Sequence, residues 1–101
     1  MFIGIYYDEN FNRCCKLFVG VDEWHKVTWN PDVVVVDIID FKAEGRDYNE
    51  RKESVREIAI KFSNSDLGGL NYGELETTQD WFRIFGRRYG LLREFADNGI
   101  C

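Results

Sequence analysis

Hydrophobic positions in the first part of the chain recur with the period of two that is typical of β-strands. FIGIYY (2–7) and CKLFVGV (15–21) alternate in this way, and WHKVTW (24–29) is rich in aromatic and β-branched residues. VVVVDIIDF (33–41) is apolar on both faces apart from two aspartates, which indicates a central strand. Because the links between these segments are short, we expect consecutive strands to pair antiparallel.

Hydrophobic positions in the second part recur at the helical period. Asp47 followed by Glu50 has the form of a capping box at a helix start. Behind it, a set of apolar residues falls on one helical stripe: Tyr48, Val55, Ile58, Ala59 and Phe62. We therefore predict a helix over about 47–63, with a strand over 57–62 as the alternative. Residues 63–76 are expected to form a glycine-rich loop.

A second helix is predicted over about 78–98. Thr77 supplies a cap with an acid three residues on, and NGI (98–100) fits a Schellman ending in which the isoleucine packs on Phe95. The apolar positions span about half of the helical wheel, as expected for the main core helix. The sequence therefore predicts a single α+β domain over 1–101, an antiparallel sheet of three to four strands with two helices packed on it.

The segment DWFRIFGRRYGLLREF (80–95) holds four arginines, which are not equivalent on a helical wheel. Arg88 falls in the middle of the apolar arc, where a guanidinium needs a carboxylate partner. We predict a structural ion pair between Arg88 and either Asp37 or Asp40, which lie in the apolar strand segment. Binding of a partner or a ligand by Arg88 is the alternative.

Arg83 and Arg87 fall on the opposite arc of the same helix, beside Gly86 and Gly90. Glycine inside a helix costs about 1 kcal/mol relative to alanine, so we expect either the close approach of another backbone or a bend there. The resulting basic strip is either a solvated helix face or a contact surface for an acidic partner or a phosphate backbone.

Size and composition indicate one soluble domain. The chain has 101 residues, of which 45% are hydrophobic and 16% aromatic, and its formal net charge is −5. An acidic chain repels nucleic acid and anionic lipid, and it suits a basic protein surface. The sequence has no signal-peptide pattern and no apolar run of membrane length, and its three cysteines show no disulfide pattern. We therefore expect a cytoplasmic protein.

Few residues indicate catalytic chemistry. Cys14, Cys15 and His25 are the candidates for a nucleophile and its base, but their spacing matches no local signature. These residues also lack the separated ligand pairs of a zinc site. We therefore expect no catalytic residue, no metal and no cofactor, and a cysteine-dependent enzyme is the least favoured alternative.

In size, acidity and aromatic content the chain resembles small stand-alone inhibitors, although no residues align with them. Toxin-immunity proteins and phage anti-defence proteins, including anti-CRISPRs, are of this kind. The resemblance implies a non-enzymatic module that binds and inhibits a larger basic or nucleic-acid-handling protein. The residues predicted to contact this partner are acidic, aromatic or part of the basic strip: Asp22, Glu23, Trp24, Asp66, Tyr72, Glu74, Glu76, Arg83 and Arg87. The alternative is a nucleic-acid-binding accessory protein that uses Arg83 and Arg87, and an open sheet face would also permit a homodimer.

Overall fold

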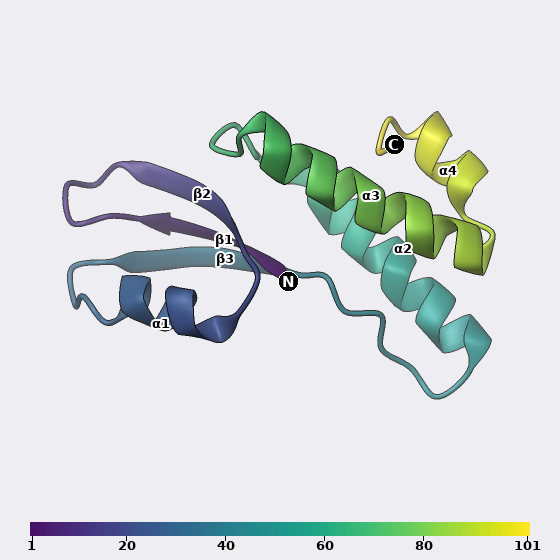
Figure 1. The fold of residues 1–101 in the computed structure, drawn as a ribbon, viewed down its shortest axis with the longest axis horizontal. Helices are drawn as coiled ribbons and strands as arrows, with labels where there is room; N and C mark the ends of the chain where they lie inside the picture. Colours follow the sequence, from purple (N-terminus) through teal and green to yellow (C-terminus); the bar gives the residue numbers. More distant parts are fainter. The chain divides into compact units, whose positions relative to one another are not determined.

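The computed structural model describes residues 1–101, and its contacts divide them into two compact units (Figure 1). Unit 1 comprises Met1–Asp40 and Leu67–Asn71 and contains the strands and one helix. Unit 2 comprises Phe41–Asp66 and Tyr72–Cys101 and contains the other three helices. The predicted α+β class is confirmed. The packing of helices on the sheet, and the organisation as a single domain, stay predictions.

The sheet of unit 1 has three antiparallel strands in the order β2-β1-β3. The strands are β1 (Phe2–Tyr7), β2 (Arg13–Phe18) and β3 (Val34–Asp40). The strand predicted at 33–41 is therefore an edge strand, and the expectation that it is central was wrong. It also pairs with β1 rather than with the element before it. The central strand is β1 instead, because its first five residues are all buried and it pairs with β2 on one side and with β3 on the other.

The segment 24–29, which was predicted to be a strand, belongs to the helix α1 (Val21–Thr28). Aromatic and β-branched residues gave it a strand propensity, but its apolar positions follow helical spacing. Trp24 is buried, and Val27 packs against the same core three residues later. Acidic residues in the first turn also favour the helix, because they face the positive end of its dipole.

Trp24 is the centre of an aromatic core in unit 1, together with Phe2, Tyr6 and Phe18. Its ring makes edge contacts with these three rings at centroid distances of 5.7, 5.8 and 5.1 Å. The indole lies over Gly4, where an added Cβ would stand 2.4 Å from its Cζ3. Because Trp24 is only 9% exposed, it is a core residue and not the partner contact that was predicted.

Unit 2 contains α2 (Tyr48–Asn64), α3 (Tyr72–Tyr89) and α4 (Leu92–Asp97). The predicted helix over 47–63 is confirmed as α2. Its start has the expected cap, because the Asp47 carboxylate accepts a 2.9 Å hydrogen bond from the Glu50 N–H.

The predicted helix over 78–98 was wrong at its start and in its continuity. Helix α3 begins at Tyr72, so it takes up part of the expected loop over 63–76. Thr77 does not cap the helix, because its hydroxyl donates a 3.0 Å hydrogen bond back to the Gly73 carbonyl inside α3. Thr78 donates in the same way to the Leu75 carbonyl, at 2.7 Å.

Gly90 divides the predicted helix into α3 and α4. It has φ +69°, and the Leu91 N–H donates to the Gly86 carbonyl at 2.7 Å, which is the pattern of a Schellman ending. The second ending, predicted at 98–100, is confirmed. Gly99 has φ +70°, and the Ile100 N–H donates to the Phe95 carbonyl at 2.9 Å.

Gly86 allows α4 to fold back onto α3. The residue is buried, and an added Cβ would stand 3.0 Å from the Phe95 ring and 3.1 Å from the Leu92 side chain. The sequence predicted the close approach of another backbone or a bend at this glycine, whereas the structure shows the close approach of two side chains, Phe95 and Leu92.

Candidate protein-interaction surfaces

The acidic and aromatic residues predicted to contact a partner lie on both units. Asp22 and Glu23 are exposed in the first turn of α1 in unit 1. In unit 2, Tyr72 is 83% exposed at the start of α3, and Glu74 and Glu76 follow it in the same helix. Asp66 is exposed after the end of α2. Tyr72 and Glu76 lie one turn apart on the same face of α3, whereas Glu74 lies on another face. One surface formed by the whole set stays a prediction.

The basic strip on α3 carries less free charge than the sequence indicates. Arg83 donates a 2.8 Å hydrogen bond to the Asp80 carboxylate one turn earlier, so this ion pair offsets its charge. Arg87 is exposed, but Gly86 beside it is covered by α4. The glycine expected to leave a bare backbone for a partner is therefore used within unit 2.

Arg88 is exposed in the last turn of α3. Because α3 ends at Tyr89, Arg88 lies near the negative end of the helix dipole, which favours a cation without any buried carboxylate. Arg88 belongs to unit 2 whereas Asp37 and Asp40 belong to unit 1, and the ion pair between them stays a prediction.

The cysteines and the histidine of unit 1 lie in different settings. Cys15 is buried, and Cys14 is half-buried with its Sγ 3.9 Å from the Asp8 Oδ2. His25 is exposed on α1 and not in a strand. Burial, followed by the neighbouring Cys14 and Asp8, raises the pKa of the Tyr6 phenol.

Two further findings concern metals and membranes. The structure brings no three side chains of histidine, cysteine, aspartate or glutamate together in a group that could hold a metal ion. None of the helices combines the length and the apolar character that a membrane crossing needs.

Unit 1 exposes nine large apolar side chains. They lie at the end of β1, in its loops, at the ends of α1 and along β3: Tyr7, Phe11, Val19, Val21, Trp29, Val34, Val35, Val36 and Ile38. Phe11 and Trp29 are the largest of those in loops; the sequence indicated Trp29 only as one of several aromatic residues that would be candidate contacts if exposed, and it did not indicate Phe11. Both stand next to turn-forming residues, in DENFN (8–12) and WNPDV (29–33), and this was the signal for their exposure.

The loop 8–12 between β1 and β2 holds Phe11 in an unusual backbone conformation. The Phe11 N–H donates to the Asp8 carbonyl and the Asp8 N–H donates to the Asn12 carbonyl, both at 3.0 Å. The Asp8 carboxylate accepts from the N–H groups of Asn10 and Asn12, both at 2.9 Å. Asp8 and Asn12 thus close a three-residue hairpin loop, 9–11. The last residue of such a loop adopts the left-handed conformation and is usually glycine. Here the residue is Phe11, with φ +60°.

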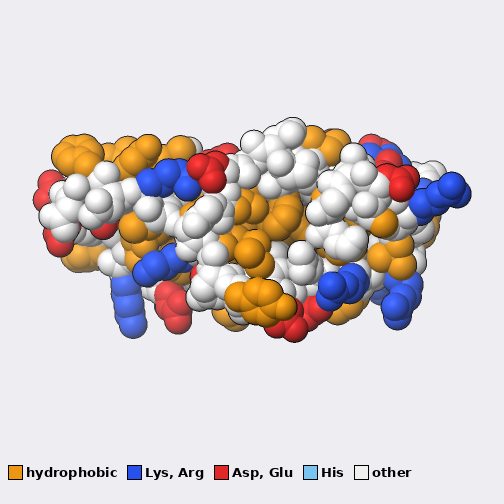
Figure 2. All heavy atoms as spheres, turned by 90° about the horizontal axis from the view of Figure 1, so that it is seen from above, with side chains coloured by type: hydrophobic (Ala, Val, Ile, Leu, Met, Phe, Trp, Pro, Cys, Tyr) orange, Lys and Arg blue, Asp and Glu red, His pale blue; other side chains and the backbone are white.

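The loop 29–33 lies beside the hairpin loop, at the same end of the sheet (Figure 1). The Asn30 side-chain amide donates to the Glu9 carboxylate at 3.1 Å and so joins the two loops. The Asn30 side-chain oxygen accepts from the Asp32 N–H at 3.0 Å, which fixes the turn. We call residues 8–12 and 29–33 together the end surface. Figure 2 shows hydrophobic and acidic side chains together at this end, on the left of the view.

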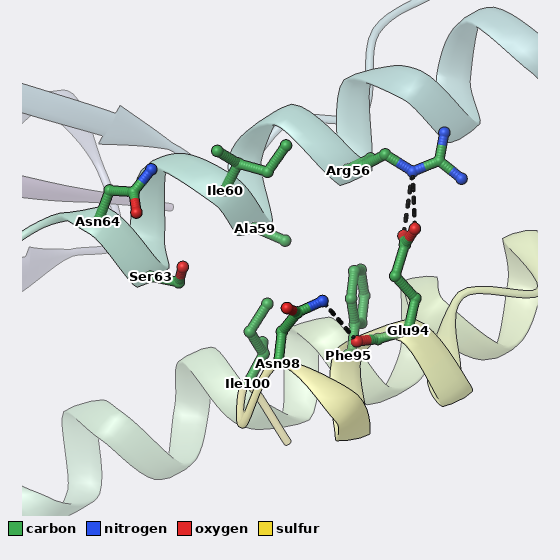
Figure 3. A pocket seen from close by; sticks show the side chains of 9 residues that line it. All are labelled: Arg56, Ala59, Ile60, Ser63, Asn64, Glu94, Phe95, Asn98 and Ile100. Atoms are coloured by element: carbon green, nitrogen blue, oxygen red, sulfur yellow. Dashed lines mark hydrogen bonds and ion pairs between the residues drawn. The ribbon is translucent and has the colours of Figure 1, made fainter.

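A pocket of about 360 Å³ lies between α2 and α4 in unit 2 (Figure 3). Its walls include the apolar side chains of Ala59, Phe95 and Ile100. At its rim, the Arg56 Nε donates to both carboxylate oxygens of Glu94, at 3.2 and 3.0 Å. Arg56 also pairs with Glu53 on its own helix. Ser63, Asn64 and Asn98 also line the pocket, so its walls are partly polar.

Comparison of the chain with models of known families, with curated proteins and with solved structures found no match. The function is therefore argued from the chemistry of the surfaces.

Proposed function

We propose that the protein is a small, acidic, non-enzymatic binding module that inhibits a larger protein with a basic surface. The observation that carries this proposal is the set of large apolar side chains exposed on unit 1. Exposed apolar patches are typical of protein-interaction sites, because the exclusion of water from apolar surface on binding provides the driving force. Protein inhibitors of defence systems and of toxins act in this way, by covering a functional surface of a larger protein.

The charge of the chain supports a basic partner. With a net charge of −5, the protein repels acidic surfaces and is attracted to a surface rich in lysine and arginine. Proteins that handle nucleic acids carry such surfaces, so a nucleic-acid-handling protein is the proposed class of target.

The test is capture of a specific partner followed by measurement with purified components. The immobilised protein is used to retrieve partners from the cells that produce it, and each candidate is purified and titrated by calorimetry. We expect a roughly 1:1 complex with a basic protein, whose association slows steeply as salt is raised. Retrieval of acidic partners only, or of none, would contradict the proposal.

The nucleic-acid alternative needs a basic strip on α3, and the pairing of Arg83 with Asp80 weakens that strip. A labelled single-stranded oligonucleotide, titrated at low salt, distinguishes the two functions. Binding that weakens with salt, and less steeply so in the Arg83→Ala/Arg87→Ala variant, would support the alternative.

A further inference from the structure

Phe11 costs the fold stability at the place it occupies. A side chain with a Cβ in the left-handed conformation costs about 1–2 kcal/mol relative to an ordinary conformation. Burial does not offset this cost, because Phe11 is 79% exposed. Residues held in strained conformations cluster at functional sites, where a need outside the fold keeps them in place.

Trp29 lies in the loop that the Asn30–Glu9 hydrogen bond joins to the loop of Phe11, and it also adds little to the core. Its side chain is 88% exposed at the C-terminal end of α1. Its backbone N–H donates a 2.8 Å hydrogen bond to the His25 carbonyl. The Asn30–Glu9 hydrogen bond fixes the two loops to each other. Two large aromatic side chains are therefore exposed on neighbouring loops whose backbones are held by hydrogen bonds, which reduces the entropy lost on binding.

We propose that Phe11 and Trp29 are paired anchors that enter an apolar cleft with a basic rim on the protein partner. The inference rests on the proposed function and identifies the contact that would carry it. The end surface contains three acidic residues, Asp8, Glu9 and Asp32, and two cations border it, Arg13 after the hairpin loop and Lys26 in a hollow with Trp29. The excess of acids favours lysine and arginine around the cleft, and it disfavours an anionic membrane or a nucleic acid.

The free edge of β3 is a weaker candidate for the docking site, although its valines are exposed. The Asp37 carboxylate accepts the Ile38 N–H at 2.8 Å, so this edge donor is already occupied. A register shift opposite Ile5 and Tyr6 also interrupts the strand. Charged side chains and bulges of this kind protect sheet edges against pairing with another chain.

The first arm of the test needs no partner. The variant Phe11→Gly removes the strain, so we expect its unfolding temperature to rise by about 3–6 °C. A fall would show that Phe11 stabilises the fold, and it would overturn the premise of the inference. The matched control is Val19→Gly in the same unit, at a side chain that is 82% exposed and that lies outside the end surface; it has no positive φ to relieve and is expected to gain nothing.

The second arm locates the contact. A photoreactive benzophenone amino acid replaces Phe11, Trp29 or Val19 in turn, and the cross-linked protein is identified and purified. The double variant Phe11→Ser/Trp29→Ser is expected to raise the Kd for that protein by about 30-fold or more, and Val19→Ser by less than about twofold. Cross-links to a basic protein from positions 11 and 29, together with this loss of affinity, would support the inference.

The remaining outcomes separate the inference from the proposed function. A basic partner that binds the double variant as well as the wild type would overturn the anchors and leave the proposed function standing. Cross-links from positions 11 and 29 to lipid, to nucleic acid, to an acidic protein or to a second copy of the chain would overturn the inference. Failure of the wild type to bind any basic protein would overturn both.

Discussion

Alanine at Gly4 tests the packing on which unit 1 depends. An added Cβ would stand 2.4 Å from the Trp24 Cζ3 and 2.9 Å from its Cε3 and Cη2. Carbon atoms in contact are normally about 3.5–4.0 Å apart, so the indole or the strand must move by about 1 Å. The indole has little freedom to move, because Phe2, Tyr6 and Phe18 surround it.

The expected cost follows from two opposing effects. Overpacking of a filled core costs about 1–3 kcal/mol, whereas replacing a glycine in a strand gains about 0.5–1 kcal/mol. We therefore expect Gly4→Ala to lower the free energy of unfolding by about 1–2 kcal/mol. Urea unfolding followed by tryptophan fluorescence measures this change as a lower midpoint with an unchanged slope.

The matched control is Gly20→Ser, at the cap of α1. No atom lies within 4 Å of an added Cβ there, and φ is −131°. A serine at this cap can accept a hydrogen bond from the first turn, so we expect stability to be unchanged or slightly raised. Equal stability of Gly4→Ala and the wild type would refute the placement of Trp24 over β1.

Three further predictions concern the helical ending, an ion pair and a buried phenol. Gly90→Ala is expected to destabilise the protein by about 1 kcal/mol and Gly90→Asn by less, because asparagine tolerates the left-handed conformation better. Thermal unfolding should give the lower unfolding temperature for Gly90→Ala. A double-mutant cycle of Arg56→Gln with Glu94→Gln is expected to give a coupling energy of about 0.5–1 kcal/mol, since the Arg56 Nε donates to both carboxylate oxygens and the pair is half-exposed. The more exposed Arg83–Asp80 pair is the control and should give less, and equal couplings would contradict the argument. The raised pKa of Tyr6 means that the folded chain keeps this proton to higher pH than the unfolded chain, so its contribution to stability is complete below about pH 10 and is lost above it. The urea midpoint of Tyr6→Phe should therefore fall less between about pH 9 and 11 than that of the wild type. An equal fall of the two midpoints would contradict a contribution of the Tyr6 proton to stability.

The elements that the sequence predicted well are those whose local signals agree. Helix α2 has a cap at Asp47 and a continuous apolar stripe, so both its existence and its start were predicted. β1 is a run of apolar residues followed directly by the turn-forming residues of 8–12, and its bounds were predicted without error. The Schellman ending at Gly99 was predicted because glycine, its neighbours and the apolar residue behind it fit a single motif.

The errors arose where two local signals compete. In α1, strand propensity outweighed a helical spacing that only one turn of sequence could show. At Gly90, a glycine with helix-forming residues on both sides looked like a tolerated interior residue, whereas it ends α3. β3 lies at the edge because it pairs with β1 alone, and β1 pairs with β2 on its other side. This pairing is between segments distant in sequence, so the residues of 33–41 alone do not indicate it.

Aromatic residues show most clearly what composition alone leaves open. Trp24 and Trp29 lie five positions apart in one short helical segment, yet one is the centre of a core and the other is 88% exposed. Their neighbours distinguish them, because Trp24 has an apolar residue at helical spacing while Trp29 stands directly before the turn residues Asn30 and Pro31. The same criterion separates Phe11, within polar turn residues, from core aromatics on strands. For this chain, an aromatic residue next to a turn signal is therefore a better indicator of an exposed aromatic side chain than aromatic content as a whole.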